Sequence, residues 1–257
     1  MLSTENILFG GLVGVALGLT GSGGSILVIP FLVYGLGLPL HTALALSLLI
    51  VATLSFVGAV RQGMSGDIAW SQAISFSIFG MVISPLVLHL TRHVSQEIHL
   101  TLFGILMLFI ALNMTFPLFK TAQGPSLEGV KPSATSLGLG GVSVGVLSGF
   151  FGVGSGFLIV PLLTLIFRMP YRLAVGTSLV VVTLVSFAGF LGAAALGGPL
   201  PWHIVRDFIL GGSVGILLAS TLVSRVKETL SRRIFAVLLL VIGSFMLYEN
   251  LTHKGSF

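Results

Sequence analysis

The apolar positions of this chain fall into ten segments, five in each half, separated by short polar loops. They cover residues 7–20, 26–37, 42–60, 68–90 and 98–118, then 137–151, 157–167, 173–196, 205–223 and 234–248. In each half the last three segments are of order 20 residues, enough for a helix to cross a hydrocarbon core of about 30 Å, and the first two are too short. The pattern predicts an all-α, polytopic membrane protein, with a pair of half-helices and three full transmembrane helices in each half.

The two halves also repeat one another. Residues 18–30 read GLTGSGGSILVIP, and residues 149–161, about 131 positions later, read GFFGVGSGFLIVP. Each stretch is a glycine-rich break inside an apolar run. Duplicated halves with broken helices at matching places are typical of transporters whose substrate binds where the breaks meet. We expect an N-terminal repeat at 1–120, a polar linker at 121–136 and a C-terminal repeat at 137–257, packed together as one unit.

Two half-helices joined by glycines form either a re-entrant hairpin or one long broken crossing. A hairpin leaves an odd number of crossings per half and inverts the second repeat, whereas a broken crossing keeps the repeats parallel. Under the inverted scheme most Lys and Arg residues collect on one side, and the other side holds only Arg92, Arg206 and Lys254. Because cytoplasmic loops accumulate positive charge, this favours the inverted repeat with both termini outside the cytoplasm.

Composition excludes several classes of function. Hydrophobic residues make up 55% of the chain and charged residues 7%, whereas roughly a quarter of the residues in soluble domains are charged. The absence of cysteine excludes disulfides, thiolate metal sites and thiol catalysis. No basic cluster marks a nucleic-acid surface. We expect every Lys, Arg, Asp and Glu to lie outside the apolar segments, which leaves no intramembrane carboxylate for proton coupling.

The glycine breaks are the candidate binding site for an anion. Their amides cannot be satisfied by lipid, so they must face protein, water or a ligand. The half-helix after each break should begin at Ser25 or about Gly156 and direct its partial positive charge at the break. Serine and threonine hydroxyls add neutral donors. The expected binding residues are Thr20, Gly21, Ser22, Gly23, Gly24, Ser25, Ser47, Gly152, Val153, Gly154, Ser155, Gly156, Thr177 and Ser178.

Other readings of these residues are open. The glycines can serve only a kink or close packing, and membrane hydroxyls often bond to carbonyls of their own helix. Glycines spaced by four before each break are expected to pack against another helix; they are Gly10, Gly14 and Gly18, then Gly141, Gly145 and Gly149. Arg61, Arg168 and Arg172, at segment ends, are expected mainly to orient the chain, with a gate for an anion as the alternative.

The two breaks and the residues after them resemble the sulfite exporter TauE/SafE family of bacterial membrane proteins. The first copy has Gly21-Ser-Gly-Gly-Ser25 followed by Pro30, Pro39 and Ala43, and the second copy repeats this order. Ser25 and Ser155 stand where the family pattern has glycine. The resemblance covers nearly the whole chain and implies transport of sulfite, sulfonates or other sulfur-containing anions, in a multi-pass protein of the bacterial inner membrane.

The sequence therefore predicts an exporter of a small sulfur-containing oxoanion, with no cofactor, metal site or catalytic residue. The alternatives are an anion channel and an uptake permease for organosulfonates. An enzyme is not expected, because the apolar segments offer only His41, His89, His99 and His203 near their ends. The expected partners are a small anionic substrate and the lipid bilayer, with no nucleic acid, and the oligomeric state is left open.

Overall fold

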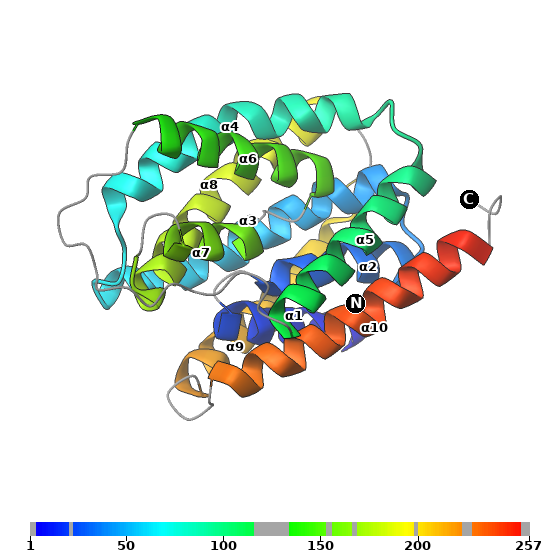
Figure 1. The fold of residues 1–257 in the computed structure, drawn as a ribbon. Coiled ribbons are helices and arrows are strands. Elements are labelled where there is room, and N and C mark those ends of the chain that lie inside the picture. The colour runs from blue at the N-terminus through cyan, green and yellow to red at the C-terminus, as the bar shows by residue number, and fades with distance from the viewer. Residues whose placement is uncertain are drawn as a thin grey trace.

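The computed structural model describes residues 4–20, 23–115, 134–152, 156–165, 169–197, 200–222 and 228–252, which are almost entirely helical (Figure 1). The first half contains α1 (Thr4–Thr20), η1 (Gly23–Leu27), α2 (Val28–Pro30), η2 (Phe31–Gly35), α3 (Leu40–Met64), α4 (Trp70–Thr91) and α5 (Gln96–Thr115). The second half contains α6 (Ala134–Phe151), α7 (Gly156–Leu165), α8 (Tyr171–Ala195), α9 (Trp202–Leu222) and α10 (Glu228–Thr252). No strand occurs in these ranges, so the all-α prediction is confirmed.

The long helices have the length and surface of membrane-spanning helices. Four stretches of the described chain are long and apolar enough to cross a bilayer: Leu40–Met64, Trp70–Thr91, Tyr171–Ala195 and Trp202–Ala219. In α5 and α10 the corresponding apolar stretches are shorter, Gln96–Leu112 and Ala236–Asn250. Large apolar side chains such as Val82 and Phe109 are more than half exposed on these helices, as a lipid-facing surface requires. The protein is a multi-pass membrane protein.

Helices α3 and α8 cross at the centre of the molecule. A Cβ on Gly189 would lie 3.2 Å from Leu48 Cδ1, and a Cβ on Gly58 would lie 3.1 Å from Leu179 Cδ1. The early part of each helix therefore contacts the late part of the other, and the two run antiparallel. Both pairs are related by the same spacing that relates the two repeats, so the contact is reciprocal.

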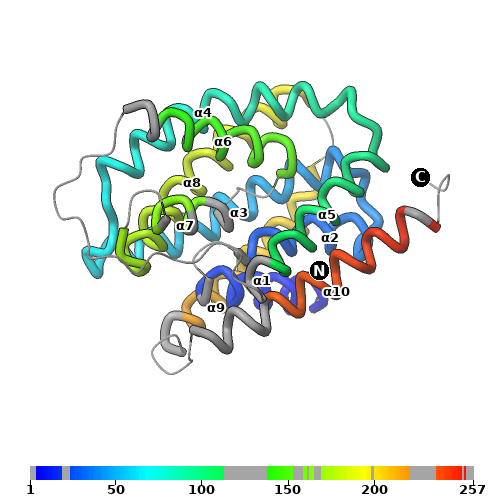
Figure 2. Tube along the Cα trace, viewed as in Figure 1, coloured from blue at the N-terminus to red at the C-terminus, as the bar shows by residue number. Residues whose placement is uncertain are grey.

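The glycine stripes join each half to the other. A Cβ on Gly10 of α1 would lie 2.5 Å from the carbonyl oxygen of Phe208 in α9, and one on Gly141 of α6 would lie 2.6 Å from that of Phe76 in α4. The predicted packing role of these stripes is confirmed. Figures 1 and 2 show α6 alongside α4 and α5 alongside α10. The main helix contacts thus run between the halves rather than within them.

The chain reverses direction at each glycine break. After α1, a Cβ on Gly24 would lie 2.6 Å from Val13 O, and the ring of Phe31 stacks on Phe9 at a centroid distance of 3.8 Å. In the second half, a Cβ on Gly140 would lie 3.0 Å from Leu162 Cδ2. The residues after each break therefore run back along the helix that precedes it.

The two returning segments differ in regularity. In the second half α7 is an α-helix that begins at Gly156, as the sequence predicts. In the first half the segment begins at Gly23 as a 3₁₀ turn and ends as a π turn at Gly35, with only α2 between them. The predicted half-helix is therefore present as a short apolar helix, but it is irregular and begins before Ser25. Glycine in a helix costs about 1 kcal/mol relative to alanine, and Gly23, Gly24 and Gly35 all belong to this stretch.

Candidate functional site

The second break is held against the first half of the chain by Ser47. Gly152 follows α6 with a φ of 65°, a conformation that favours glycine. The hydroxyl of Ser47 in α3 donates a hydrogen bond to the carbonyl oxygen of Gly152 over 2.7 Å, and both groups are buried. A Cβ on Gly152 would lie 2.6 Å from Leu44 Cδ2. The hydroxyl of Ser47, an expected substrate ligand, therefore donates its hydrogen bond within the protein in this conformation.

Thr177 holds a loop rather than a helix break. Its Oγ1 accepts a hydrogen bond of 3.0 Å from the backbone N–H of Ala69, and the carbonyl of Asp67 lies directly against Gly176. The loop between α3 and α4 thus closes over the early turns of α8. Ser178 beside it donates to Val175 O in its own helix over 2.8 Å, which is the alternative reading of such hydroxyls.

The remaining predicted residues are described only in part. Thr20 ends α1, Gly23 begins η1 and Gly156 begins α7, while Gly24 packs on α1 and Ser25 is fully buried. Arg61 and Arg172 are exposed near the ends of α3 and α8. Six predicted residues lie outside the described part of the chain: Gly21, Ser22, Val153, Gly154, Ser155 and Arg168.

A cavity of about 220 Å³ opens beside the second break, where α3 begins and α4 and α8 end. We call it the vestibule. Leu44 lines it and also covers Gly152. The guanidinium of Arg92, which also lines it, donates a hydrogen bond to Leu196 O over 3.4 Å. The described residues that line it are His41, Thr42, Leu44, Ala45, Leu88, Arg92, Ala193, Ala194, Leu196, Gly197 and Leu200.

The two ends of the α3–α8 pair differ. At one end Gly176 and Thr177 carry the loop that contains Ala69. The matching residues at the other end are Ala45, which lines the vestibule, and Leu46. Ala45 has a methyl group where Gly176 has a hydrogen, and Leu46 has an apolar side chain where Thr177 has a hydroxyl. The two features that hold the loop at Gly176 and Thr177 are therefore missing at this end. One end is therefore sealed by this loop and the other opens into the vestibule.

Thr177→Val is expected to weaken the attachment of the loop between α3 and α4 to α8. The change keeps the shape of the side chain and removes the acceptor of the Ala69 N–H, a loss of about 1 kcal/mol. In an Ile68→Cys background, labelling by a charged thiol reagent should rise about fivefold. The chain has no cysteine of its own, so the signal comes from that site alone.

Thr183→Val is the matched control for this experiment. Thr183 lies on the same helix and its hydroxyl donates to Leu179 O of that helix over 2.7 Å. It should leave the labelling rate unchanged. Equal rates in the Thr177 and Thr183 variants would show that the hydrogen bond to Ala69 does not hold the loop.

Several buried polar side chains were not among the predicted site residues. Asp207 in α9 is fully buried and accepts hydrogen bonds of 3.1 and 3.0 Å from Arg206. This corrects the expectation that acidic and basic residues lie outside the apolar segments, since both residues stand within 205–223. The buried ring of His99 stacks on Phe150, at a centroid distance of 4.7 Å, just before the second break. Ser84, buried in α4, was likewise missed.

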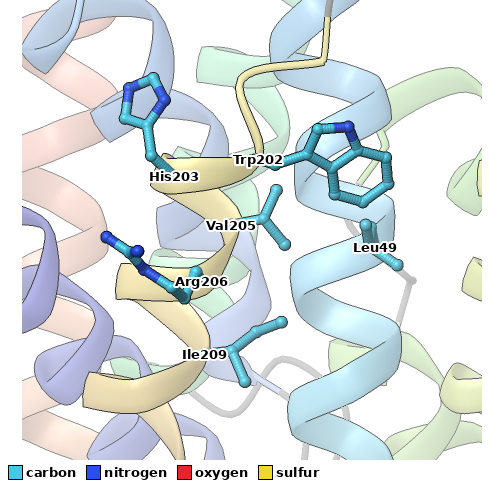
Figure 3. A pocket seen from close by; sticks show the side chains of 6 residues that line it. All are labelled: Leu49, Trp202, His203, Val205, Arg206 and Ile209. Atoms are coloured by element: carbon cyan, nitrogen blue, oxygen red, sulfur yellow. The ribbon is translucent and has the colours of Figure 1, made fainter.

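A second recess, of about 550 Å³, lies between α3 and α9 (Figure 3). Figure 3 shows Leu49 of α3 opposite Val205 and Ile209 of α9. Arg206 also lines this recess and is bonded to Asp207. No described residue of either break lines this recess or the vestibule, but Leu44 of the vestibule covers Gly152, so the vestibule is the better candidate for an entrance to the site.

Comparison with known proteins identifies the family. The sulfite exporter TauE/SafE family matches residues 6–246. Proteins named probable membrane transporter protein from two strains of Xylella fastidiosa are 32% identical over 249 residues, covering 94% of this chain and 93% of theirs. One of the same name from Methanocaldococcus jannaschii is 30% identical over 191 residues, covering 72% of this chain and 70% of its own. No solved structure matches significantly. The chain is a membrane transporter that belongs to the sulfite exporter TauE/SafE family.

Proposed function

We propose that this transporter exports a small sulfur-containing oxoanion, such as sulfite or a sulfonate, along a path that passes the second glycine break. The observation that carries the proposal is the position of the vestibule. It reaches Leu44, which covers Gly152, the described glycine of that break. Transporters built with broken helices bind their substrates at the interruptions, so the substrate needs a path from the bilayer surface to the break.

The inverted arrangement of the two repeats is part of the same proposal. The reversal of the chain at each break supports hairpins, and hairpins leave three crossings in each half. The antiparallel course of α3 and α8 supports the inversion, because equivalent helices then enter the bilayer from opposite sides. With the loop charges as the guide, the vestibule and Arg92 face away from the cytoplasm of the bacterial inner membrane.

Export of an anion is favoured by the membrane potential. Each negative charge that leaves a cell with a negative interior gains about 2.3 kcal/mol per 100 mV. An exporter of this kind needs no coupled ion. Neutral donors such as amides and hydroxyls suit it, since they hold an anion without the strength of a fixed positive charge.

The loop between α3 and α4, which covers one end of the α3–α8 pair, favours a carrier over an anion channel. A channel in its conducting state provides a continuous pore, whereas here the loop hydrogen-bonded to Thr177 covers the end opposite the vestibule. A carrier of this design exposes its site to one side at a time. Transport should therefore be saturable and should show counterflow.

Flux measurements on purified protein in liposomes test the function. Efflux of sulfite or methanesulfonate is expected to saturate with concentration and to accelerate when the potential repels the anion. Empty liposomes and chloride provide the controls. Electrically silent flux, or no flux of any sulfur oxoanion, would refute the proposal, and unitary current steps would identify a channel instead.

A further inference from the structure

The three helices that enclose the vestibule meet again one turn deeper in the protein. The vestibule is lined by Leu44 of α3, Leu88 of α4 and Ala193 of α8. The next layer inward contains Leu48, Ser84 and Gly189, one from each helix. A Cβ on Gly189 would lie 2.7 Å from Ser84 Oγ and 3.2 Å from Leu48 Cδ1, so these residues are in contact. The floor of the vestibule therefore rests on a layer that contains a hydroxyl.

The hydroxyl of Ser84 is buried without a hydrogen-bond partner. Its side chain is 0% exposed, and Oγ has no partner among the described residues. Ser77, two turns earlier on α4, instead donates to Ala73 O of its own helix over 2.7 Å. A buried hydroxyl with no partner is costly, and each such group in a native structure calls for an explanation.

Neighbouring hydroxyls around the second break share this state. Ser148 is one turn before Gly152, whose N–H donates to Ser148 O over 2.8 Å, and Ser186 is one turn before Gly189. Both side chains are fully buried and their hydroxyls have no partner among the described residues. Three buried hydroxyls on the helices near the second break therefore have no partner in the described part of the chain.

The first break shares one of these three hydroxyls and lacks two. The counterpart of Ser186 is Ser55, which is also fully buried and has no partner among the described residues. The counterparts of Ser148 and Ser84 are Leu17 of α1 and Ile216 of α9, when Gly18 is aligned with Gly149 and Trp202 with Trp70. Both are buried apolar side chains, 0% and 2% exposed. The surroundings of the two breaks thus differ in chemistry at the positions of Ser84 and Ser148.

We propose that Ser84 is a substrate-binding residue, and that the anion site is one-sided, lying beneath the vestibule at the second break. The Ser84 hydroxyl donates a hydrogen bond to an oxygen of the sulfur oxoanion when the layer of Leu48, Ser84 and Gly189, which is closely packed in this conformation, opens to the vestibule. This inference rests on the proposed function.

Ser84→Ala in the full-length protein tests the assignment, with Ser77→Ala as the matched control. Losing a hydrogen bond to a charged ligand should raise the half-saturating sulfite concentration about tenfold or more. The maximal rate should stay within about twofold, because binding is what the change removes. Ser77→Ala should leave both quantities unchanged.

Thermal unfolding separates a binding role from a structural one. Removing a hydroxyl that has no partner should leave the melting temperature of Ser84→Ala equal to that of wild type or higher. Added sulfite should stabilise the wild-type protein and should have little effect on this variant. A lower melting temperature with a parallel loss of rate in Ser84→Ala would point to packing and overturn the assignment.

The outcomes distinguish this inference from the proposed function. Normal sulfite affinity in Ser84→Ala, with saturable flux through the wild-type protein, overturns the one-sided site and leaves the export function standing. No flux of sulfite or methanesulfonate through the wild-type protein overturns both. A tenfold or larger loss of affinity in Ser84→Ala alone supports both.

Discussion

Gly152→Ala is expected to abolish transport of the proposed substrate, a sulfur oxoanion, whereas Gly37→Ala should keep it within about twofold of wild type. Both glycines have positive φ, 65° and 63°, so a side chain costs about 1–2 kcal/mol of backbone strain at either position. They differ in their surroundings. The new Cβ at Gly152 would lie 2.6 Å from Leu44 Cδ2, whereas nothing lies within 4 Å of one at Gly37.

The pair of variants separates backbone strain from the space at the second break. Initial rates of sulfite counterflow, divided by the amount of protein inserted in the liposomes, provide the measurement. Displacement of Leu44 would disturb both the floor of the vestibule and the hydrogen bond from Ser47 to Gly152. Similar rates in the two variants would mean that the packing around Gly152 is not needed for transport.

The second large effect is expected from Gly141→Val in α6. Its Cβ would lie 2.6 Å from the backbone oxygen of Phe76 in α4, an atom that cannot turn aside as a side chain can. Overpacking of this kind costs about 1–3 kcal/mol or more, and here it would separate two helices of different halves. We expect little folded protein after extraction in mild detergent, and a clearly lower melting temperature in what remains.

Gly138→Val, one turn earlier on α6, is the matched control. Its Cβ would meet the ring of Phe79 at 3.6 Å, an ordinary contact distance. Size-exclusion chromatography and thermal unfolding should therefore give values close to wild type for this variant. A stable, monodisperse Gly141→Val protein would show that α6 does not need its close approach to α4.

The helical class and the position of the breaks could be predicted from local sequence. The apolar segments are too long and too poor in charge for a soluble fold, and the break after Gly149 is marked by glycines inside an apolar run. The irregular segment around Pro30 could not be predicted in this way. Pro161 occupies the matching place in the regular helix α7, so the difference depends on the glycines around Pro30 and on their packing.

The site could be predicted only in outline. Ser47 was chosen because Ser178 stands at the matching position of the other repeat, and Thr177 because it belongs to the same group of small hydroxyl residues. Their partners are Gly152 and Ala69, more than 100 residues away in sequence, and no local pattern reveals such contacts. Ser84 was missed for the opposite reason. It has no hydroxyl counterpart in the other repeat, so a search for symmetry passes over the position where the two repeats differ in chemistry.

The exchange of contacts between the halves has a consequence for biogenesis. Helix α1 packs on α9, α4 on α6 and α5 on α10. The first helix of each pair is therefore inserted in the bilayer before the helix that it contacts has been synthesised. The glycine-lined surface of α1, and the surface of α4 that later receives α6, are open to lipid during that time. Two polypeptides cut within residues 121–133 should accordingly assemble when they are synthesised together, and each should be degraded by membrane proteases when it is synthesised without the other.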